Sequence, residues 1–184
     1  SLLRRYTLPV RDVQRFDQLP IPFRAVATDM ESGAAVVLDR GDLALALRSS
    51  MSVPGVFSPT EVDGRVLGDG GLVNNLPIDV ARAMGADVVI AVNIGTPPGG
   101  RETLNSAVGL TAQMLNLLTE QNVQRSLATL RPDDVLIAPA LGQLSSGDFD
   151  RGTTFFSLGE AGARGRSDRL APLALAADDY ARWR

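Results

Sequence analysis

The stretch VLGDGGLVNNLP, residues 66–77, places one carboxylate between glycines at the end of a short apolar run. Val66 and Leu67 are typical of a strand, and the glycines beside Asp69 predict a tight turn after it. Glycine also allows another backbone or a substrate to approach closely. Because open α/β sheets carry their chemistry at the carboxyl ends of strands, Asp69 is a candidate catalytic residue.

The residues after this turn predict a helix and then a second strand. Pro77 suits the first turn of a helix, and Gly85 suits its C-terminal cap. The apolar stretch ADVVIAVNIG, residues 86–95, is typical of a strand buried on both faces in a parallel sheet. Residues 66–93 are therefore interpreted as a βαβ unit in an α/β fold.

The rest of the chain alternates strands and helices. Asp63-Gly64 is a tight hairpin signal, and Asp42 is a candidate helix N-cap. The expected strands are 22–30, 34–39, 134–139 and two short runs within 60–69, and the expected helices are 41–51, 103–130 and 150–170. On the long helix, one broad apolar face is expected to contain Leu104, Ala107, Val108, Thr111, Met114, Leu115 and Leu118. The last residues, DDYARWR, read as a short helix or a linker.

Composition excludes several kinds of site. The 184 residues contain no Cys and no His, so they supply neither a Cys/His zinc site nor a Ser-His-Asp triad. The net charge is -3 and aromatic residues make up 5%, which argues against a nucleic-acid partner. No apolar run approaches the roughly 20 residues of a membrane-spanning helix.

The motif Gly68-Asp69-Gly70-Gly71 has several readings. The plainest is an ordinary turn. A dinucleotide-binding loop fails because Val73 stands where the third glycine is needed. An aspartyl-nucleophile phosphatase needs a separate D-x-D-x-T motif, and the only candidate, DFDRG (148–152), has glycine in place of threonine. The remaining reading is a catalytic Asp69, which would need a nucleophile beside it.

A longer pattern decides among these readings. The segments IPFRAVATDMESG, GDLALALRSSMSVPGVFSP and GRVLGDGGLVNNLPIDVARAMGADVVIAVNIG together resemble the second half of a bacterial patatin-like phospholipase. The resemblance covers about residues 17–95, and DVLIAPALGQLSSGDFD continues it downstream. It implies a lipid acyl hydrolase, a phospholipase A or esterase, that uses a Ser-Asp dyad.

The resemblance assigns the catalytic role to Asp69. It makes Gly68, Gly70, Gly71, Asn74, Asn75 and Pro77 residues of the motif that support the site. No serine here has glycine at both −2 and +2, so the family's G-x-S-x-G nucleophile is missing from this sequence. Ser49, Ser50 and Ser52 resemble a serine-rich stretch near the family's site, and they read best as polar residues ending a helix. The chain alone is therefore expected to be inactive.

The expected fold is a partial three-layer α/β/α patatin-like fold with a mainly parallel central sheet. Residues 1–95 are expected to be the C-terminal part of the phospholipase domain, and residues 96–184 a mainly helical extension packed on it. The resemblance implies no cofactor and no metal. The alternative function is a binding or scaffold module without catalysis.

The expected partners follow from the same resemblance. They are a phospholipid or other lipid ester, a membrane surface, the missing N-terminal half of the domain and a second copy of the chain, with no nucleic acid among them. The resemblance favours an exported or outer-membrane-associated bacterial protein and leaves a cytoplasmic location open.

Overall fold

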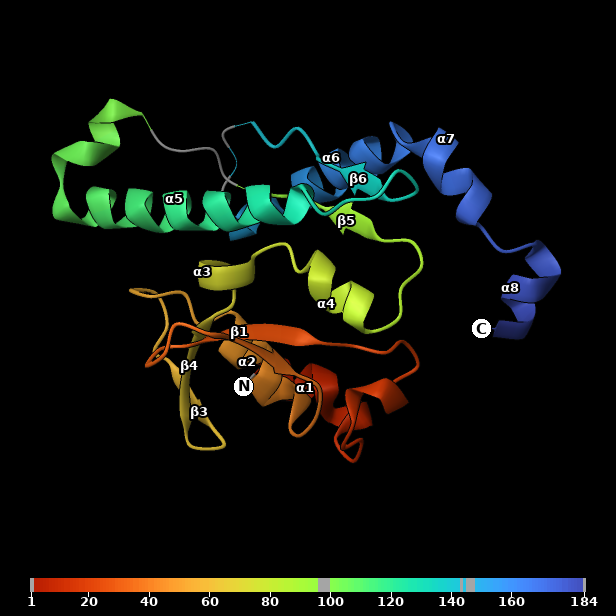
Figure 1. The fold of residues 1–184 in the computed structure, drawn as a ribbon, viewed down its shortest axis with the longest axis horizontal. Helices are drawn as coiled ribbons and strands as arrows, with labels where there is room; N and C mark the ends of the chain where they lie inside the picture. The colour runs from red at the N-terminus through yellow and green to blue at the C-terminus, as the bar shows by residue number, and fades with distance from the viewer. Residues whose placement is uncertain (1, 96–99, 143, 145–147, 184) are drawn as a thin grey trace. The chain divides into compact units, whose positions relative to one another are not determined.

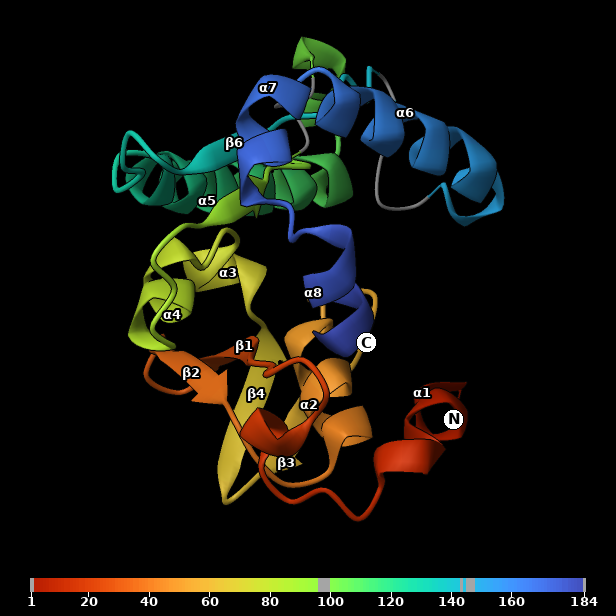
Figure 2. The same ribbon diagram turned by 90° about the vertical axis from the view of Figure 1, so that its right-hand side faces the viewer.

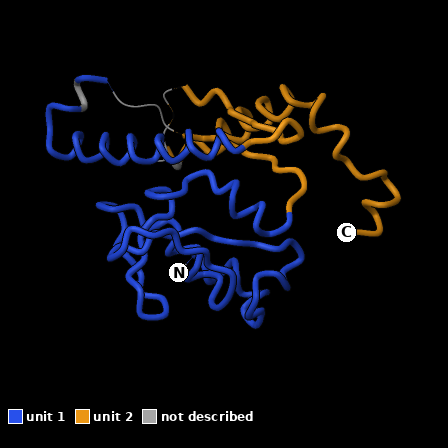
Figure 3. The backbone as a smooth tube through the Cα atoms, viewed as in Figure 1, with its two compact units in different colours: residues 1–85, 97–129 blue, residues 86–96, 130–184 orange. Residues whose placement is uncertain are grey.

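A computed structural model describes residues 2–95, 100–142, 144 and 148–183. The chain forms two compact units, shown in different colours in Figure 3. The first unit comprises residues 1–85 and 97–129, and the second comprises residues 86–96 and 130–184. Because these units alternate along the sequence, they do not test the expected boundary at residue 95, which stays a prediction.

The first unit contains a four-stranded sheet that is antiparallel throughout. Its strands are β1 (Ala25–Asp29), β2 (Ala35–Leu38), β3 (Thr60–Val62) and β4 (Arg65–Asp69). They lie in the order β2-β1-β4-β3, and all four are labelled in Figure 2. The α/β class is confirmed, but a mainly parallel sheet is not what the structure shows. Short hairpin connections join β1 to β2 and β3 to β4, and such connections produce antiparallel neighbours.

Both hairpins follow from local turn chemistry. Asp63 and Gly64 have φ values of 52° and 75°, so the predicted turn between β3 and β4 is confirmed. Between β1 and β2, the Asp29 carboxylate accepts hydrogen bonds from the backbone N–H groups of Glu31 and Ser32. These contacts hold the chain in its reversal before β2 begins.

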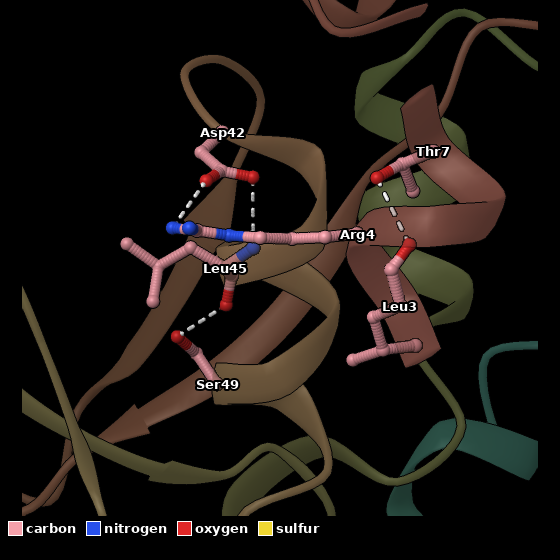
Figure 4. A network of polar contacts seen from close by, with 6 residues as sticks. All are labelled: Leu3, Arg4, Thr7, Asp42, Leu45 and Ser49. Carbon is pink, nitrogen blue, oxygen red and sulfur yellow. Dashed lines mark hydrogen bonds and ion pairs between the residues drawn. The ribbon is translucent and has the colours of Figure 1, made fainter. Parts of the chain in front are cut away.

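Helix α2 (Leu43–Ser50) begins at the predicted N-cap. Asp42 accepts a hydrogen bond of 3.2 Å from the backbone N–H of Leu45. Its other carboxylate oxygen accepts a hydrogen bond of 3.4 Å from Arg4 of helix α1 (Leu2–Thr7), as Figure 4 shows. One side chain therefore both caps α2 and links it to α1, and α2 packs in turn against β1 and β4.

The main buried cluster joins this sheet to α2 and to the short 3₁₀ helix Phe16–Gln18. Its buried members are Phe16, Ala25, Ala27, Leu38, Ala46 and Leu67. Alanines dominate the part contributed by β1 and α2. Small side chains let the helix approach the sheet closely, and the Phe16 ring fills the adjoining space.

After β4 the chain forms two short helices, α3 (Gly71–Asn74) and α4 (Ile78–Ala83). The same unit includes a 3₁₀ helix, Arg101–Asn105, and the long helix α5 (Ala107–Leu127). The helix predicted over 103–130 is thus confirmed, although it begins later, at Ala107, and ends earlier, at Leu127. In Figure 1, α3 lies between β1 and α5, and it packs against both.

The predicted apolar face of α5 is not buried. Of its predicted members, Val108, Met114 and Leu118 are 82, 58 and 50% exposed, whereas the buried residues of α5 are Asn122 and Val123. The spacing predicts an apolar face, but burial of such a face needs a neighbouring element. The described residues leave this face open.

The second unit contains the parallel pair β5 (Ile90–Val92) and β6 (Val135–Ile137). Two expectations are wrong here. β5 pairs with β6 and not with β4, so residues 66–93 do not form a βαβ unit in one sheet. β5 is also not buried on both faces, since Ile90 and Val92 are about half exposed and only Ala91 is buried.

Helices complete this unit. They are α6 (Gly152–Arg164), α7 (Ser167–Leu170) and α8 (Ala177–Trp183), joined by the 3₁₀ helix Ala171–Leu173 and preceded by another, Phe149–Arg151. The helix predicted over 150–170 is divided after Arg164, and residues 177–183 are helical (Figure 2). Gly162 lets α6 approach β6, because a Cβ there would lie 3.3 Å from Ile137 Cγ2.

Candidate functional site

Asp69 is the last residue of β4, as the sequence predicts, and its main chain is held on both sides. Its backbone N–H donates a hydrogen bond of 3.0 Å to the carbonyl oxygen of Ser52. Its carbonyl oxygen accepts a hydrogen bond of 2.6 Å from the hydroxyl group of Thr28 on β1. The strand end is therefore fixed between β1 and the segment that follows α2.

The Asp69 carboxylate bends back over the turn that follows it. One carboxylate oxygen accepts a hydrogen bond of 2.7 Å from the backbone N–H of Gly71. Partial burial raises the pKa of Asp69, and the bond from Gly71 opposes this increase. Across the described residues, no Arg side chain forms an ion pair with Asp69. Among the described residues, its carboxylate is thus partly desolvated and has no neutralising partner.

The glycines of the motif are required by close contacts. A Cβ on Gly70 would lie 2.1 Å from the carbonyl oxygen of Val26, so only glycine fits against β1 there. A Cβ on Gly71 would lie 2.8 Å from the Asp69 carboxylate, and one on Gly68 would lie 2.4 Å from the sulfur of Met30. None of these glycines has a positive φ, so their role is close approach.

The other predicted motif residues lie just beyond the carboxylate. Asn74 donates a side-chain hydrogen bond of 2.9 Å to Asp79, at an exposed position. Asn75 contributes its backbone N–H, which donates to the side-chain oxygen of Asn122 at 2.8 Å. Pro77 is the N-cap residue of α4. The described contacts of Asn74, Asn75 and Pro77 thus concern the turn and the helix start, with none to the Asp69 carboxylate.

The serine-rich segment contributes backbone groups to the site. Ser49 and Ser52 are buried, and their hydroxyl groups donate to the carbonyl oxygens of Leu45 and Arg48. Two backbone carbonyl groups of this segment hold the strand end. The Ser50 carbonyl oxygen accepts a hydrogen bond of 3.2 Å from the N–H of Gly70, and the Ser52 carbonyl oxygen accepts one from the N–H of Asp69. This agrees with the interpretation of these serines as residues that end a helix.

Arg48 holds the chain that follows α2. Its guanidinium donates to the hydroxyl group of Ser52 and, at 3.0 Å, to the carbonyl oxygen of Ser58. It also lies over the Phe57 ring, 4.8 Å from the centroid. Because Ser52 accepts from the N–H of Asp69, Arg48 acts on the segment that supports the site.

Sequence reasoning missed Asn122. This residue of α5 is 3% exposed, and its side-chain amide donates to the carbonyl oxygen of Gly71 at 2.9 Å and to that of Leu118 at 3.2 Å. Its oxygen accepts from Asn75. The nearest signal in the sequence is a polar residue beside Val123, and that signal does not identify a partner more than 40 residues away.

Other features of the described chain do not add a reactive group to this site. Two surface cavities border Asp42, and neither includes Asp69. No cluster of three or more Asp or Glu side chains suited to a metal ion occurs among the residues with described positions. Within the same part of the chain, no helix has the length and apolar character needed to cross a membrane.

Comparison with known proteins shows what part of the chain is similar to. Residues 8–82 match the model of the family described as Patatin-like phospholipase. The resemblance seen in the sequence is therefore confirmed over these residues. The match includes β4, Asp69 and the turn that follows, and it agrees with the α/β/α architecture expected for the family.

Individual relatives agree with this match. An uncharacterized NTE family protein of Mycobacterium tuberculosis is 42% identical over 110 residues, which cover 58% of this chain and 30% of the relative. Patatin-like phospholipase domain-containing protein 7 of Mus musculus is 44% identical over 85 residues, or 45% of this chain and 6% of the relative. Patatin-like phospholipase domain-containing protein 6 of Homo sapiens is 40% identical over the same length. The chain thus matches less than a third of the length of these relatives.

Proposed function

We propose that this chain supplies the catalytic aspartate, Asp69, of a patatin-like lipid acyl hydrolase. The family match supports lipid hydrolysis, and the observation that carries the residue assignment is the environment of the carboxylate. Asp69 ends a strand, is partly desolvated, accepts one backbone hydrogen bond and has no ion-pair partner among the described residues. Such a carboxylate is available to accept a proton.

The proposed chemistry is a Ser-Asp dyad. A serine hydroxyl attacks the ester carbonyl while Asp69 takes its proton as the general base. The tetrahedral intermediate collapses, the alcohol leaves with that proton, and an acyl-enzyme remains. Water then attacks the acyl group, Asp69 accepts the proton of the water, and the proton returns to the serine as the acid is released. Because a base works best when its pKa approaches the working pH, the raised pKa of Asp69 favours this role.

The nucleophile is proposed to come from protein outside these 184 residues, because no G-x-S-x-G occurs within them. A glycine-rich loop of the same absent segment would donate backbone N–H groups to the oxyanion. On this proposal, the roles of Gly68, Gly70 and Gly71 are to bring β4 against β1 and to leave the carboxylate accessible. The chain by itself is proposed to be inactive.

Exposed apolar side chains support the proposal that another protein segment completes this chain. On α5 these include Leu110, Met114, Leu117 and Leu118, and on β5 they include Ile90 and Val92. β5 is also paired along one edge only in the described part of the chain. The proposed partners are the missing half of the domain, a lipid-water surface that presents the substrate, and a second copy of the chain.

The test is the Asp69→Asn variant of the complete natural protein that contains this chain. Hydrolysis of a short-chain p-nitrophenyl ester should fall by at least about 100-fold, because a general base contributes on that order. The matched control is Asp63→Asn, which removes the same charge at the exposed turn between β3 and β4 and should retain activity. Near-normal turnover by Asp69→Asn would contradict the assignment.

The absence of the G-x-S-x-G motif from these residues also keeps a second function in consideration. A patatin-derived module without a nucleophile would bind or support a partner instead of hydrolysing a lipid. Turnover in the complete protein that depends on Asp69 would exclude this alternative. A complete protein that is folded, lacks G-x-S-x-G and hydrolyses no ester would favour it.

A further inference from the structure

One buried amide on α5 connects that helix to the turn that follows Asp69. Asn122 has its side-chain oxygen 2.8 Å from the N–H of Asn75 and its side-chain nitrogen 2.9 Å from the carbonyl oxygen of Gly71. These two backbone groups lie at the beginning and just past the end of α3. Asn122 of α5 therefore forms hydrogen bonds to both ends of this one-turn helix.

These hydrogen bonds are important because α3 cannot be stable by itself. A helix of four residues makes very few internal hydrogen bonds, and an isolated helix of that length is unfavourable in water. Glycine at its first position adds conformational freedom that folding must remove. The external bonds from Asn122 offset part of this cost and select one geometry for Gly71.

Gly71 is also the residue that contacts the reactive carboxylate. Its N–H donates to Asp69 at 2.7 Å, while its carbonyl oxygen accepts from Asn122. The backbone of one residue is therefore held at its carbonyl by α5 and directs its N–H at Asp69. If the hydrogen bond from Asn122 is lost, the backbone of Gly71 can rotate, and its N–H is no longer held in the direction of Asp69.

We propose that Asn122 is a positioning residue for Asp69, acting through the two backbone groups that it fixes at Gly71 and Asn75. The proposal rests on the proposed function, because it gives Asn122 a role in the reaction only if Asp69 is the base. Asn122 does not touch the carboxylate. Its effect passes through the Gly71 N–H, whose hydrogen bond favours the ionised form of Asp69.

No described charged side chain near this turn takes the place of the hydrogen bond from the Gly71 N–H to Asp69. The elements packed around the turn carry the following titratable residues: Asp29 on β1, Arg48 on α2, Arg65 on β4, Asp79 and Arg82 on α4, and Glu120 and Arg125 on α5. Within the described residues, none of these forms an ion pair with Asp69, and the Gly71 N–H is the one group that lowers its pKa. That backbone bond therefore favours the ionised form of Asp69, against the effect of burial.

The variant to make is Asn122→Leu in the complete natural protein, since leucine has a similar volume and no polar atoms. The Asp69 carboxyl is followed by carbon-13 NMR in aspartate-labelled protein and assigned by its disappearance in Asp69→Asn. We expect its titration to move to higher pH in Asn122→Leu. The acidic limb of the kcat/KM profile should move in the same direction, with a loss of about 10- to 100-fold at its acidic end.

The matched control is Gln121→Leu, which places the same side chain at the neighbouring, exposed position of α5. It should leave the titration and the pH profile unchanged. If Asn122→Leu does not fold, Asn122→Ser, which leaves room for water beside Gly71, should give a smaller shift in the same direction.

Two outcomes separate the parts of the argument. If Asp69→Asn is inactive but the Asn122 variants lose only thermal stability, with an unmoved Asp69 titration, then the positioning role is wrong and the catalytic one stands. If Asp69→Asn remains active while the Asn122 variants shift the Asp69 titration, then the contact is real and the proposed function is wrong.

Discussion

The hydroxyl group of Thr28 donates a hydrogen bond of 2.6 Å to the carbonyl oxygen of Asp69, from a position that is 4% exposed. The register pairs Thr28 with Gly68, so the side chain reaches one residue further along β4. This contact ties the last residue of β4 to β1 at the point where the backbone turns away from the sheet.

We expect Thr28→Val, which keeps the shape and removes the donor, to lower the free energy of unfolding by about 1–2 kcal/mol. The reason is that the Asp69 carbonyl oxygen loses a donor in a place that water reaches poorly. Denaturant unfolding followed by circular dichroism measures the change. Thr28→Ser should keep most of the stability, and a valine variant as stable as the wild type would show that this bond contributes nothing.

Gly70→Ala should destabilise the protein strongly. The added Cβ would meet the Val26 carbonyl oxygen at 2.1 Å, and both atoms belong to paired backbone that has little room to move. A loss of at least about 2 kcal/mol is expected. Gly68→Ala should cost less, because the atom in its way is the flexible end of Met30.

The control for these alanines is Gly159→Ala in helix α6. No atom lies within 4 Å of the Cβ that this change would add. Alanine in a helix interior is expected to raise stability by about 0.5–1 kcal/mol. A Gly70→Ala protein as stable as Gly159→Ala would mean that β1 and the Asp69 turn are not in such close contact.

Arg48→Met should weaken the segment between α2 and β3. The change keeps much of the apolar side chain but removes the donors to Ser52 and Ser58 and the cation over Phe57. A loss of about 1–3 kcal/mol is expected, since hydrogen bonds from a charged donor contribute on that scale. Arg48→Lys should recover part of it, because lysine keeps the charge but not the planar fork.

Asp69 should make the wild-type protein less stable as the pH rises. Burial raises its pKa in the folded state, so the folded protein holds this proton more tightly than the unfolded chain does. Its contribution is therefore most favourable below the usual aspartate pKa and is lost as the pH rises through the raised value. Relative to the wild type, Asp69→Asn should gain stability over that window.

Asp29 should change the stability with pH in the opposite direction to Asp69. The backbone N–H groups of Glu31 and Ser32 lower the pKa of Asp29. Its contribution is present above the usual aspartate pKa and is lost as the pH falls through the lowered value. Asp29→Asn should thus cost stability at neutral pH and little at strongly acidic pH. Urea unfolding at a series of pH values compares the two variants, and equal slopes for both would contradict these assignments.

The sequence predicts best those features that depend on neighbouring residues alone. The Asp63-Gly64 turn and the Asp42 cap are of this kind, because a few adjacent residues contain all the atoms involved. The end of β4 at Asp69 belongs with them, since the glycine-rich motif marks where the strand must stop.

Features that depend on distant partners were predicted less well. The apolar character of 86–95 indicates a strand but not its neighbour, so the expected pairing with β4 is wrong and β5 pairs with β6 instead. The position of Asn122 beside the turn also depends on distant partners. Its role exists only because α5 packs on α3, and no local pattern in either segment encodes that contact.

The bonds from Asn122 to Gly71 and Asn75 join residues that are 51 and 47 positions apart in the chain. During synthesis on the ribosome, β4 and its glycine turn emerge well before α5, and domains fold as their segments become available at about 5–20 residues per second. The turn beside Asp69 therefore spends several seconds of translation without the amide that holds it. On the proposed function, the catalytic base would become ordered late in synthesis, when long-range contacts of this kind can close.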